Sequence, residues 1–166
     1  MSDRAPHVDL LTGAFKKAHL EAQLVQAVGE AKKRRTPLCL IHVDIDELQE
    51  HNDLHGRDTL DVAISWLAGK ISEVIDGQGP IGRVGGDEFA VVLPGVTLDR
   101  AKRLAEKLRR LVPQTLHAST FGDYRLTVCV GVAALRAQEP SGNLLDAAEE
   151  ACTRAKQAGR DGVVSR

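Results

Sequence analysis

Apolar runs typical of β-strands alternate with amphipathic helical patterns along the whole chain. Runs rich in Val, Ile and Leu predict strands at residues 37–46, 83–95 (a hairpin around two glycines), 115–120 and 124–135. Apolar residues three or four positions apart predict helices at residues 14–35, 58–75, 98–112 and 143–159. This order of helix, strand, helix, hairpin, helix, hairpin and helix predicts an α+β domain, with a mostly antiparallel central sheet flanked by helices.

The size and composition of the chain fit one compact domain over residues 1–166. A length of 166 residues suits a single core, and with only 3% aromatic residues that core must be mainly aliphatic. A net charge of −1 argues against the strongly basic surface of a nucleic-acid-binding protein. Local cations remain sufficient to bind a small phosphorylated ligand.

Two further patterns bear on where such a chain works. No apolar stretch approaches the ~20 residues that span a bilayer, and the first residues lack the apolar segment of a signal peptide, so we expect no direct membrane insertion. Cys39, Cys129 and Cys152 have no zinc-type spacing, and we expect buried, reduced thiols. Both patterns predict a cytoplasmic protein.

Two acidic clusters stand where predicted strands meet turns, and they are the candidates for chemistry. The sequence Asp44-Ile45-Asp46 ends one strand, and Asp87-Glu88 opens another. Since neighbouring strand residues point to opposite faces, one acid from each cluster can share a face with a backbone carbonyl beside it. Such oxygens are the ligands that Mg²⁺ prefers, although a solvated turn with surface acids is an equally simple reading of Asp87-Glu88 alone.

Glycines and cations complete the candidate site. Gly85 and Gly86 carry no side chains, so a large ligand can approach the backbone there. Lys156 and Arg160 are four residues apart, and we expect them on one side of the last helix, one turn apart. A Lys and Arg pair suits phosphate oxygens, whereas cations near a helix C-terminus also have a purely structural explanation.

Several motifs in this chain resemble those of the GGDEF family of diguanylate cyclases. They are "DLLTG" at residues 9–13, "DIDELQEHNDLHG" at 44–56, Asp61, "GGDEF" at 85–89 and "AKQAGR" at 155–160. Their order and spacing hold over about residues 9–164. The resemblance implies a fold similar to nucleotide cyclases and polymerase palms, with a ferredoxin-like core.

The resemblance also implies an activity, namely the Mg²⁺-dependent (or Mn²⁺-dependent) condensation of two GTP molecules into cyclic di-GMP with release of pyrophosphate. It assigns metal binding to Asp44, the Ile45 carbonyl, Asp87 and Glu88, with Glu88 as ligand or base. It assigns guanine recognition to Asn52 and Asp61, and phosphate binding to Lys156, Arg160 and backbone N–H groups near Leu48 and Gln49. Because each GTP must attack the other, it implies a transient homodimer and a regulatory or dimerisation domain outside this chain.

Departures from the family pattern leave a second function open. Gln49 stands where the family has Lys, Leu60 where it has Gly, Arg57 where it has His, and Lys16-Lys17 where it has Asn-Arg. The alternative is therefore a degenerate domain that binds GTP, or another guanine nucleotide, and signals without turnover. A two-metal nuclease or phosphatase would also explain the acids, but it leaves Asn52 and Asp61 without a role.

Overall fold

The computed structural model describes residues 7–166 and confirms the predicted α+β architecture. A six-stranded sheet has the order β1-β3-β4-β2-β5-β6. The two outer pairs, β1 with β3 and β5 with β6, are parallel, and the inner pairs are antiparallel. The strands are β1 (Phe15–Lys16), β2 (Leu38–Ile45), β3 (Ile81–Arg83), β4 (Glu88–Pro94), β5 (Val128–Ala134) and β6 (Val163–Ser165).

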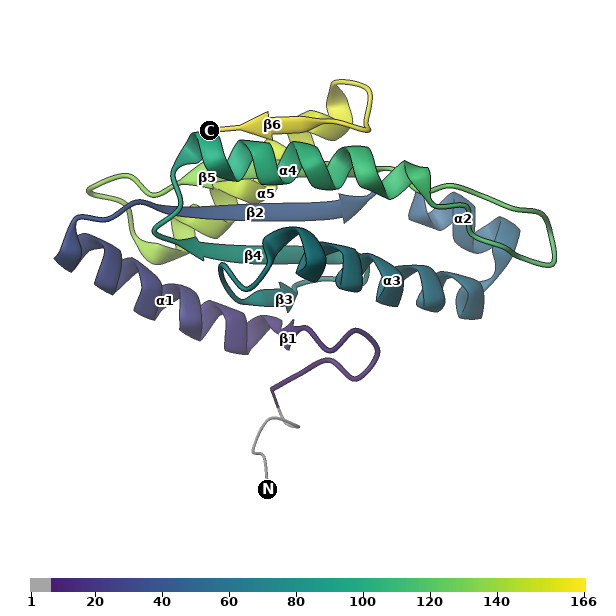
Figure 1. Ribbon diagram of the computed structural model, residues 1–166, viewed down its shortest axis with the longest axis horizontal. Coiled ribbons are helices and arrows are strands. Elements are labelled where there is room, and N and C mark those ends of the chain that lie inside the picture. The colour runs from purple at the N-terminus through teal and green to yellow at the C-terminus, as the bar shows by residue number, and fades with distance from the viewer. Residues whose placement is uncertain (1–6) are drawn as a thin grey trace.

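Helices cover both faces of this sheet, as Figure 1 shows. They are α1 (Lys17–Arg34), α2 (Leu48–His55), α3 (Arg57–Ile75), α4 (Leu98–Leu111) and α5 (Ser141–Gln157), with a short 3-10 turn at Val112–Gln114. α3 and α4 pack on one face, α1 and α5 pack on the other, and α2 lies beyond the end of β2. Every central strand is therefore buried on both sides.

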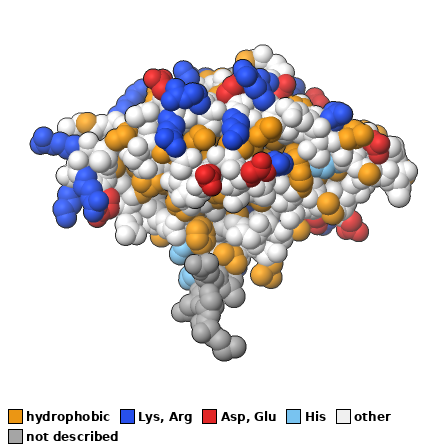
Figure 2. Space-filling view, in the orientation of Figure 1, with side chains coloured by type: hydrophobic (Ala, Val, Ile, Leu, Met, Phe, Trp, Pro, Cys, Tyr) orange, Lys and Arg blue, Asp and Glu red, His pale blue; other side chains and the backbone are white. Residues whose placement is uncertain are grey.

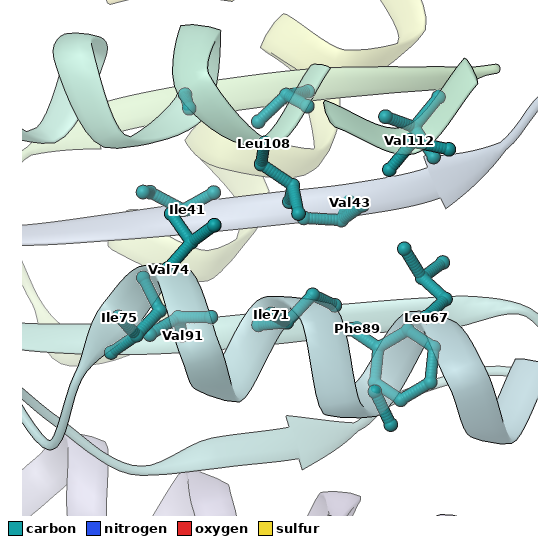
Figure 3. Packing of buried hydrophobic residues seen from close by; sticks show 14 of the residues in the cluster. Ile41, Val43, Leu67, Ile71, Val74, Ile75, Phe89, Val91, Leu108 and Val112 are labelled. Atoms are coloured by element: carbon teal, nitrogen blue, oxygen red, sulfur yellow. The ribbon is translucent and has the colours of Figure 1, made fainter. Parts of the chain in front are cut away.

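The alternation of side chains along β2 divides the core into two layers. Ile41 and Val43 face α3 and α4, where they meet Leu67, Ile71 and other aliphatic residues (Figure 3). Leu38 and Leu40 face the opposite way, toward α1 and α5. This period-two alternation sends Asp44 to the α5 face of the sheet, two residues after His42.

Local signals set several of the element ends. The side chain of Thr97 accepts a hydrogen bond from Arg100 N at the start of α4, and Pro113 follows the end of that helix. Gly159, at a φ of 119°, lies just past α5. All three cysteines are buried and unpaired, as the sequence predicts.

The prediction of a strand at residues 115–120 is wrong. This segment makes one isolated bridge, in which His117 and Tyr124 exchange two backbone hydrogen bonds of 2.8 and 2.9 Å. A strand needs a free sheet edge, and β5 is already flanked by β2 and β6. The strand β5 likewise begins at Val128 and not at residue 124. The sequence patterns also missed α2, β1 and β6.

Charge is distributed unevenly over the surface despite the net value of −1. Figure 2 shows Lys and Arg side chains gathered over the part of the helical face where α4 runs. Some of these cations are neutralised locally, since Arg109 and Arg110 both pair with Glu106 at 2.7 and 3.0 Å. Within residues 7–166, no helix combines the length and the apolar character needed to cross a bilayer.

Candidate functional site

The two acidic clusters meet where β2 ends and β4 begins. Asp44, only 6% exposed, stands directly opposite Glu88 in the antiparallel register. Burial, which is the largest cause, raises the pKa of Asp87 together with the negative charge of Asp44 and a hydrogen bond with Asp44, to about 7. Burial also raises the pKa of Glu88, with Asp44 and Glu149 adding to the effect. The structure thus concentrates three carboxyl groups at one point on the sheet.

Lys156 supplies the positive charge beside these carboxyl groups. Its ammonium group, on α5, contacts Oδ2 of Asp44. Burial lowers the pKa of Lys156, but the hydrogen bond and charge of Asp44 outweigh burial, so the pKa lies above its ordinary value. The ammonium group therefore stays protonated at neutral pH next to the acidic cluster.

The spacing predicts that Arg160 lies one helical turn beyond Lys156, and this prediction is wrong. The helix α5 ends at Gln157, and the chain turns at Gly159. Arg160 then has a φ of 65°, and its Nε lies 3.9 Å from Glu47 Oε1. The glycine stop redirects the chain before a further turn of helix can form. Arg160 remains exposed near the start of α2.

The glycine turn leaves space for the side chain of Glu88. A Cβ on Gly85 would lie 2.0 Å from Glu88 Oε2, so the Glu88 side chain occupies the space that any other residue would need. A Cβ on Gly86 would meet no atom within 4 Å. The guanidinium group of Arg83 donates to the Gly86 carbonyl (Nε, 3.0 Å) and to Asp9 Oδ1 (Nη1, 3.1 Å). Asp9 and Arg83 therefore brace the turn, a role that the residue patterns did not reveal.

A cavity of about 480 Å³ opens beside the glycine turn. Its walls come from α2 (Leu48, Gln49 and Asn52), from α3 (Arg57, Leu60, Asp61 and Ile64), and from Leu11, Arg83 and Gly86. Asn52 and Asp61, to which the family resemblance assigns guanine recognition, both line this cavity. Leu60 is 3% exposed and packs into the core, and the cavity stays open beside it.

The N-terminus of α2 borders the same cavity. The first intrahelical bond runs from His51 N to Glu47 O, at 3.1 Å. The N–H groups of Leu48 and Gln49 precede that bond, so they have no partner within the helix. Unpaired N–H groups and the helix dipole favour an anion at this position. The side chain of Gln49 donates to Asp53 Oδ1 at 3.0 Å.

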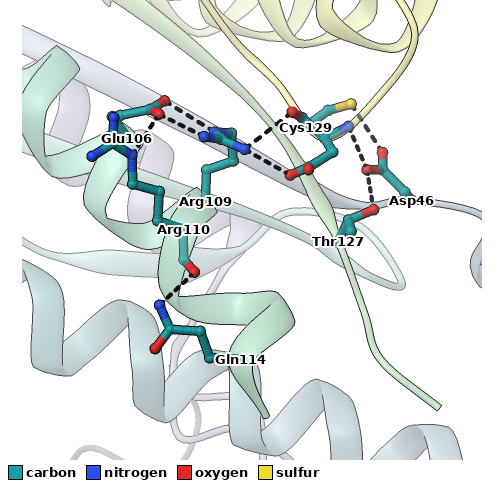
Figure 4. A network of polar contacts seen from close by, with 8 residues as sticks. Asp46, Glu106, Arg109, Arg110, Gln114, Thr127 and Cys129 are labelled. Carbon is teal, nitrogen blue, oxygen red and sulfur yellow. Dashed lines mark hydrogen bonds and ion pairs between the residues drawn. The ribbon is translucent and has the colours of Figure 1, made fainter. Parts of the chain in front are cut away.

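Asp46 has a structural role, in contrast to Asp44. It is 3% exposed and accepts hydrogen bonds from Thr127 Oγ1 (2.6 Å), Cys129 Sγ (2.9 Å) and Asp161 N (2.9 Å), part of the network in Figure 4. These bonds tie the end of β2 to β5 and to the turn that follows Arg160. Both oxygens of the Asp46 carboxylate thereby accept hydrogen bonds from protein donors.

His42 is a further residue that the sequence patterns did not single out. It is 2% exposed, its Nδ1 has no hydrogen-bond partner among residues 7–166, and its Nε2 lies 3.8 Å from Glu88 Oε1. Burial lowers the pKa of this imidazole. The available signal was a polar residue inside an apolar run, on the same strand face as Asp44.

The donor set is compatible with a hard divalent cation. Within the described residues, no group of three or more His, Cys, Asp and Glu side chains has the geometry of a metal site. Mg²⁺, however, needs only one or two carboxylates when substrate phosphates and water complete its shell. The carboxyl groups of Asp44 and Asp87 meet that requirement, because they are adjacent: besides burial, the charge of Asp44 raises the pKa of Asp87.

Comparison with known proteins places this arrangement in a family. Residues 6–162 match the family described as "Diguanylate cyclase, GGDEF domain". The chain is 33% identical to the uncharacterised protein YhcK of Bacillus subtilis and 31% identical to diguanylate cyclase DgcP of Pseudomonas aeruginosa. These matches cover 95% and 92% of this chain, but only 45% and 23% of the relatives. The chain thus spans less than half the length of these relatives.

Solved structures give the same result for the fold. The GGDEF domain of DgcB from Caulobacter crescentus, solved in complex with c-di-GMP, superposes with a TM-score of 0.93 at 28% identity, over 99% of this chain and 96% of that one. The active GGEEF domain of a Vibrio cholerae diguanylate cyclase superposes with a TM-score of 0.85 at 29% identity, over 90% and 96% of the two chains.

Proposed function

The chain belongs to the GGDEF family of diguanylate cyclase domains, and from this premise we propose that it condenses two GTP molecules into cyclic di-GMP. In each of two equivalent steps, the 3′-oxygen of one GTP attacks the α-phosphorus of the other. A P–O bond forms, the α–β phosphoanhydride bond breaks, and pyrophosphate leaves. The proton of the 3′-hydroxyl group is transferred to a base on the protein.

The observation that carries this proposal is the position of the carboxyl groups next to a nucleotide-sized cavity. Asp44, Asp87 and Glu88 gather at one end of the sheet, and the cavity adjoins them across Gly86. In this proposal Asp44, Asp87 and the Ile45 carbonyl hold Mg²⁺ or Mn²⁺, with Glu88 as a further ligand or as the base. A bound divalent cation would offset the charge that develops on the α-phosphate.

The remaining roles follow from the chemistry of the residues around the cavity. Asn52 and Asp61 hydrogen-bond to the guanine edge, Asp61 by accepting from its N–H groups. The N–H groups of Leu48 and Gln49 bind phosphate oxygens at the start of α2. Lys156 and Arg160 add positive charge for the terminal phosphates, as cations suited to phosphate oxygens.

The reaction requires two copies of the domain. One site holds one GTP, and each 3′-hydroxyl group must reach the α-phosphate of the other nucleotide. Two sites must therefore face each other, which two-fold symmetry achieves with identical surfaces. We propose a transient homodimer, assembled by a regulatory or dimerisation module outside residues 1–166.

A second candidate function has support from one feature of the phosphate subsite. Gln49 is uncharged, and its amide group is bonded to Asp53, so the N-terminus of α2 carries less positive charge than a Lys would give it. A domain of this kind can bind GTP and signal through a partner without turnover. Both candidate functions share the guanine cavity, and they differ only in whether product forms.

Incubation with GTP and Mg²⁺, followed by mass analysis of the nucleotides, separates the two functions. The cyclase proposal expects cyclic di-GMP and pyrophosphate in a ratio of one to two, and no product when EDTA is present. The Glu88→Gln variant serves as the matched negative control. GTP that binds but is recovered intact would overturn the cyclase proposal in favour of the binding module.

A further inference from the structure

Arg57 is a charged residue of the guanine cavity for which neither the fold nor the phosphate chemistry gives a use. It is exposed, it lines the cavity of about 480 Å³, and it forms no side-chain hydrogen bond or salt bridge with any residue in 7–166. The other guanidinium group in the wall, that of Arg83, is already bonded to Asp9 and to the Gly86 carbonyl. Arg57 therefore brings a free guanidinium fork to the cavity.

Helix stability does not explain a cation at this position. Arg57 is the first residue of α3, where the positive end of the helix dipole disfavours a cation. The preceding residue, Gly56, has a φ of 82° and supplies no side-chain cap. Asp58 is the acid that suits this first turn. The position of Arg57 costs the helix some stability, and this points to a role in binding.

The spacing on α3 places Arg57 beside the carboxylate proposed to read guanine. Arg57 and Asp61 are four residues apart, so they share one helix face about one turn (~5.4 Å) from each other. Both line the cavity, and no salt bridge joins them in the described part of the chain. An acceptor and a forked donor thus stand side by side, both available to a ligand.

Guanine has a matching order of groups along one edge. Its 2-amino group and N1–H donate, and its neighbouring O6 and N7 accept. If Asp61 accepts hydrogen bonds from the two donors, Arg57, one turn away on α3, is placed to donate to the two acceptors. An arginine fork bonds to O6 and N7 together, and adenine cannot satisfy it because it carries a donor amino group in place of O6.

We propose that Arg57 is a specificity-determining residue that bonds to O6 and N7 of guanine. This inference rests on the proposed function for the identity of the nucleotide, and it adds the residue that rejects adenine. Leu60 and Ile64, on the same helix, offer apolar contacts for the faces of the base. The phosphates lie elsewhere in this proposal, toward the N-terminus of α2 and Lys156.

The test is equilibrium binding of nucleoside diphosphates, which lack the pyrophosphate leaving group and do not react. Dissociation constants are measured for GDP, ADP and 7-deaza-GDP with the wild-type chain, Arg57→Ala, Arg57→Lys and the exposed control Arg103→Ala. Removing the fork should lower the GDP-to-ADP affinity ratio by about tenfold or more. The GDP-to-ADP affinity ratio should fall by most of that amount in Arg57→Lys as well, because this variant keeps the charge but lacks the guanidinium fork. Arg103→Ala should leave the ratio unchanged.

The comparison of GDP with 7-deaza-GDP isolates the hydrogen bond to N7, the atom that the analogue lacks. The wild-type chain should bind 7-deaza-GDP severalfold more weakly than GDP, and this penalty should disappear in Arg57→Ala. Equal weakening of GDP, ADP and 7-deaza-GDP would overturn the proposal, since it would show phosphate binding or a damaged fold. An Arg57-dependent GDP preference without any cyclic product from GTP would uphold this inference and reject only the cyclase activity. A wild-type chain without preference for GDP over ADP would overturn both.

Discussion

Asp44 and Glu88 are directly opposed residues on the antiparallel strands β2 and β4. Asp44 is the penultimate residue of β2, which is buried on both faces, and Glu88 begins β4, the strand that follows the glycine turn. Because their register is fixed by seven consecutive residue pairs, the two carboxyl groups are held by the sheet itself. The sheet therefore positions the candidate base, and the glycine turn leaves space for a ligand beside it.

The first prediction concerns Glu88 as the base. Glu88→Gln keeps the shape of the side chain but cannot accept the 3′-hydroxyl proton, so cyclic di-GMP formation should fall by at least about 100-fold. GTP binding should largely survive, because the cavity residues are unchanged. Turnover by product analysis and affinity by calorimetry are compared with the exposed control Glu150→Gln. Equal losses in binding and turnover would make Glu88 a binding residue.

The second prediction concerns Gly131, which lets β5 approach α5. A Cβ at this position would lie 1.9 Å from the backbone oxygen of Ala148 and 2.4 Å from Cys152 N. Backbone atoms cannot move aside cheaply, so Gly131→Ala should lower the free energy of unfolding by at least about 2 kcal/mol. Gly69→Ala, in an open position on α3, should instead raise it by about 0.5–1 kcal/mol. Urea denaturation that gives the same sign for both variants would contradict this packing.

The parts of the fold that the sequence predicts are those with long, strong patterns. The strand β2 is a mostly apolar run of eight residues, and the helices α1, α3, α4 and α5 each show a clear helical period over 14 or more residues. By contrast, α2 (LQEHNDLH) has no apolar stripe, because one side of it borders the candidate ligand cavity. The edge strands β1 and β6 have only two and three residues, too few to show a period.

The candidate site was predictable in composition but not in detail. Spacing alone cannot separate Asp44 from Asp46, since both stand at the end of the same apolar run. Only the hydrogen bonds from Thr127 and Cys129 show that Asp46 is structural. The position of Arg160 depends on a single turn at Gly159, which overrides the helical spacing. Contacts distant in sequence, such as Arg83 with Asp9, have no local signal at all.

The third prediction concerns pH and the stacked rings beside α2. Ring centroids of His117 and Tyr124 lie 5.3 Å apart, and burial lowers the pKa of His117 from 6.5. Between 6.5 and the lower folded value, the unfolded chain binds more protons, so stability falls as pH drops through this window and is fully present above 6.5. Asp87 acts in the opposite sense. Its pKa of about 7 exceeds the unfolded value of 3.8, so the stability that it contributes is lost as pH rises toward 7.

Paired variants separate these two effects. Denaturation at pH 7.5 and pH 5.5 should show a smaller acid-induced loss of stability for His117→Phe than for the wild-type chain, because Phe keeps the stack and cannot be protonated. Asp87→Asn should show a larger acid-induced loss, because the opposing contribution is removed. Parallel pH profiles for all three proteins would contradict the assigned pKa directions.

The fourth prediction concerns the charge missing at the phosphate end of the cavity. Gln49→Lys adds an ammonium group beside the unpaired N–H groups of α2, and a charge-assisted hydrogen bond to phosphate should raise kcat/KM for GTP by up to about tenfold. Gln49→Met, which removes the amide without adding charge, is the matched control and should show no gain. An unchanged rate for Gln49→Lys would show that Lys156 and Arg160 already saturate the phosphates.

The fifth prediction concerns assembly, since the proposed reaction needs two domains for each product molecule. For the isolated chain, turnover per chain should rise with protein concentration, because active pairs form only by collision. Fusion to a parallel dimeric coiled coil, at an effective concentration of about 1 mM, should raise turnover at low concentration and remove the concentration dependence. A fusion carrying Glu88→Gln controls for contaminating activity, and a coiled coil disrupted at its core positions controls for the added sequence. Turnover per chain that is the same with and without the dimeric fusion would mean that the two sites do not need to face each other, and the two-fold mechanism would have to be abandoned.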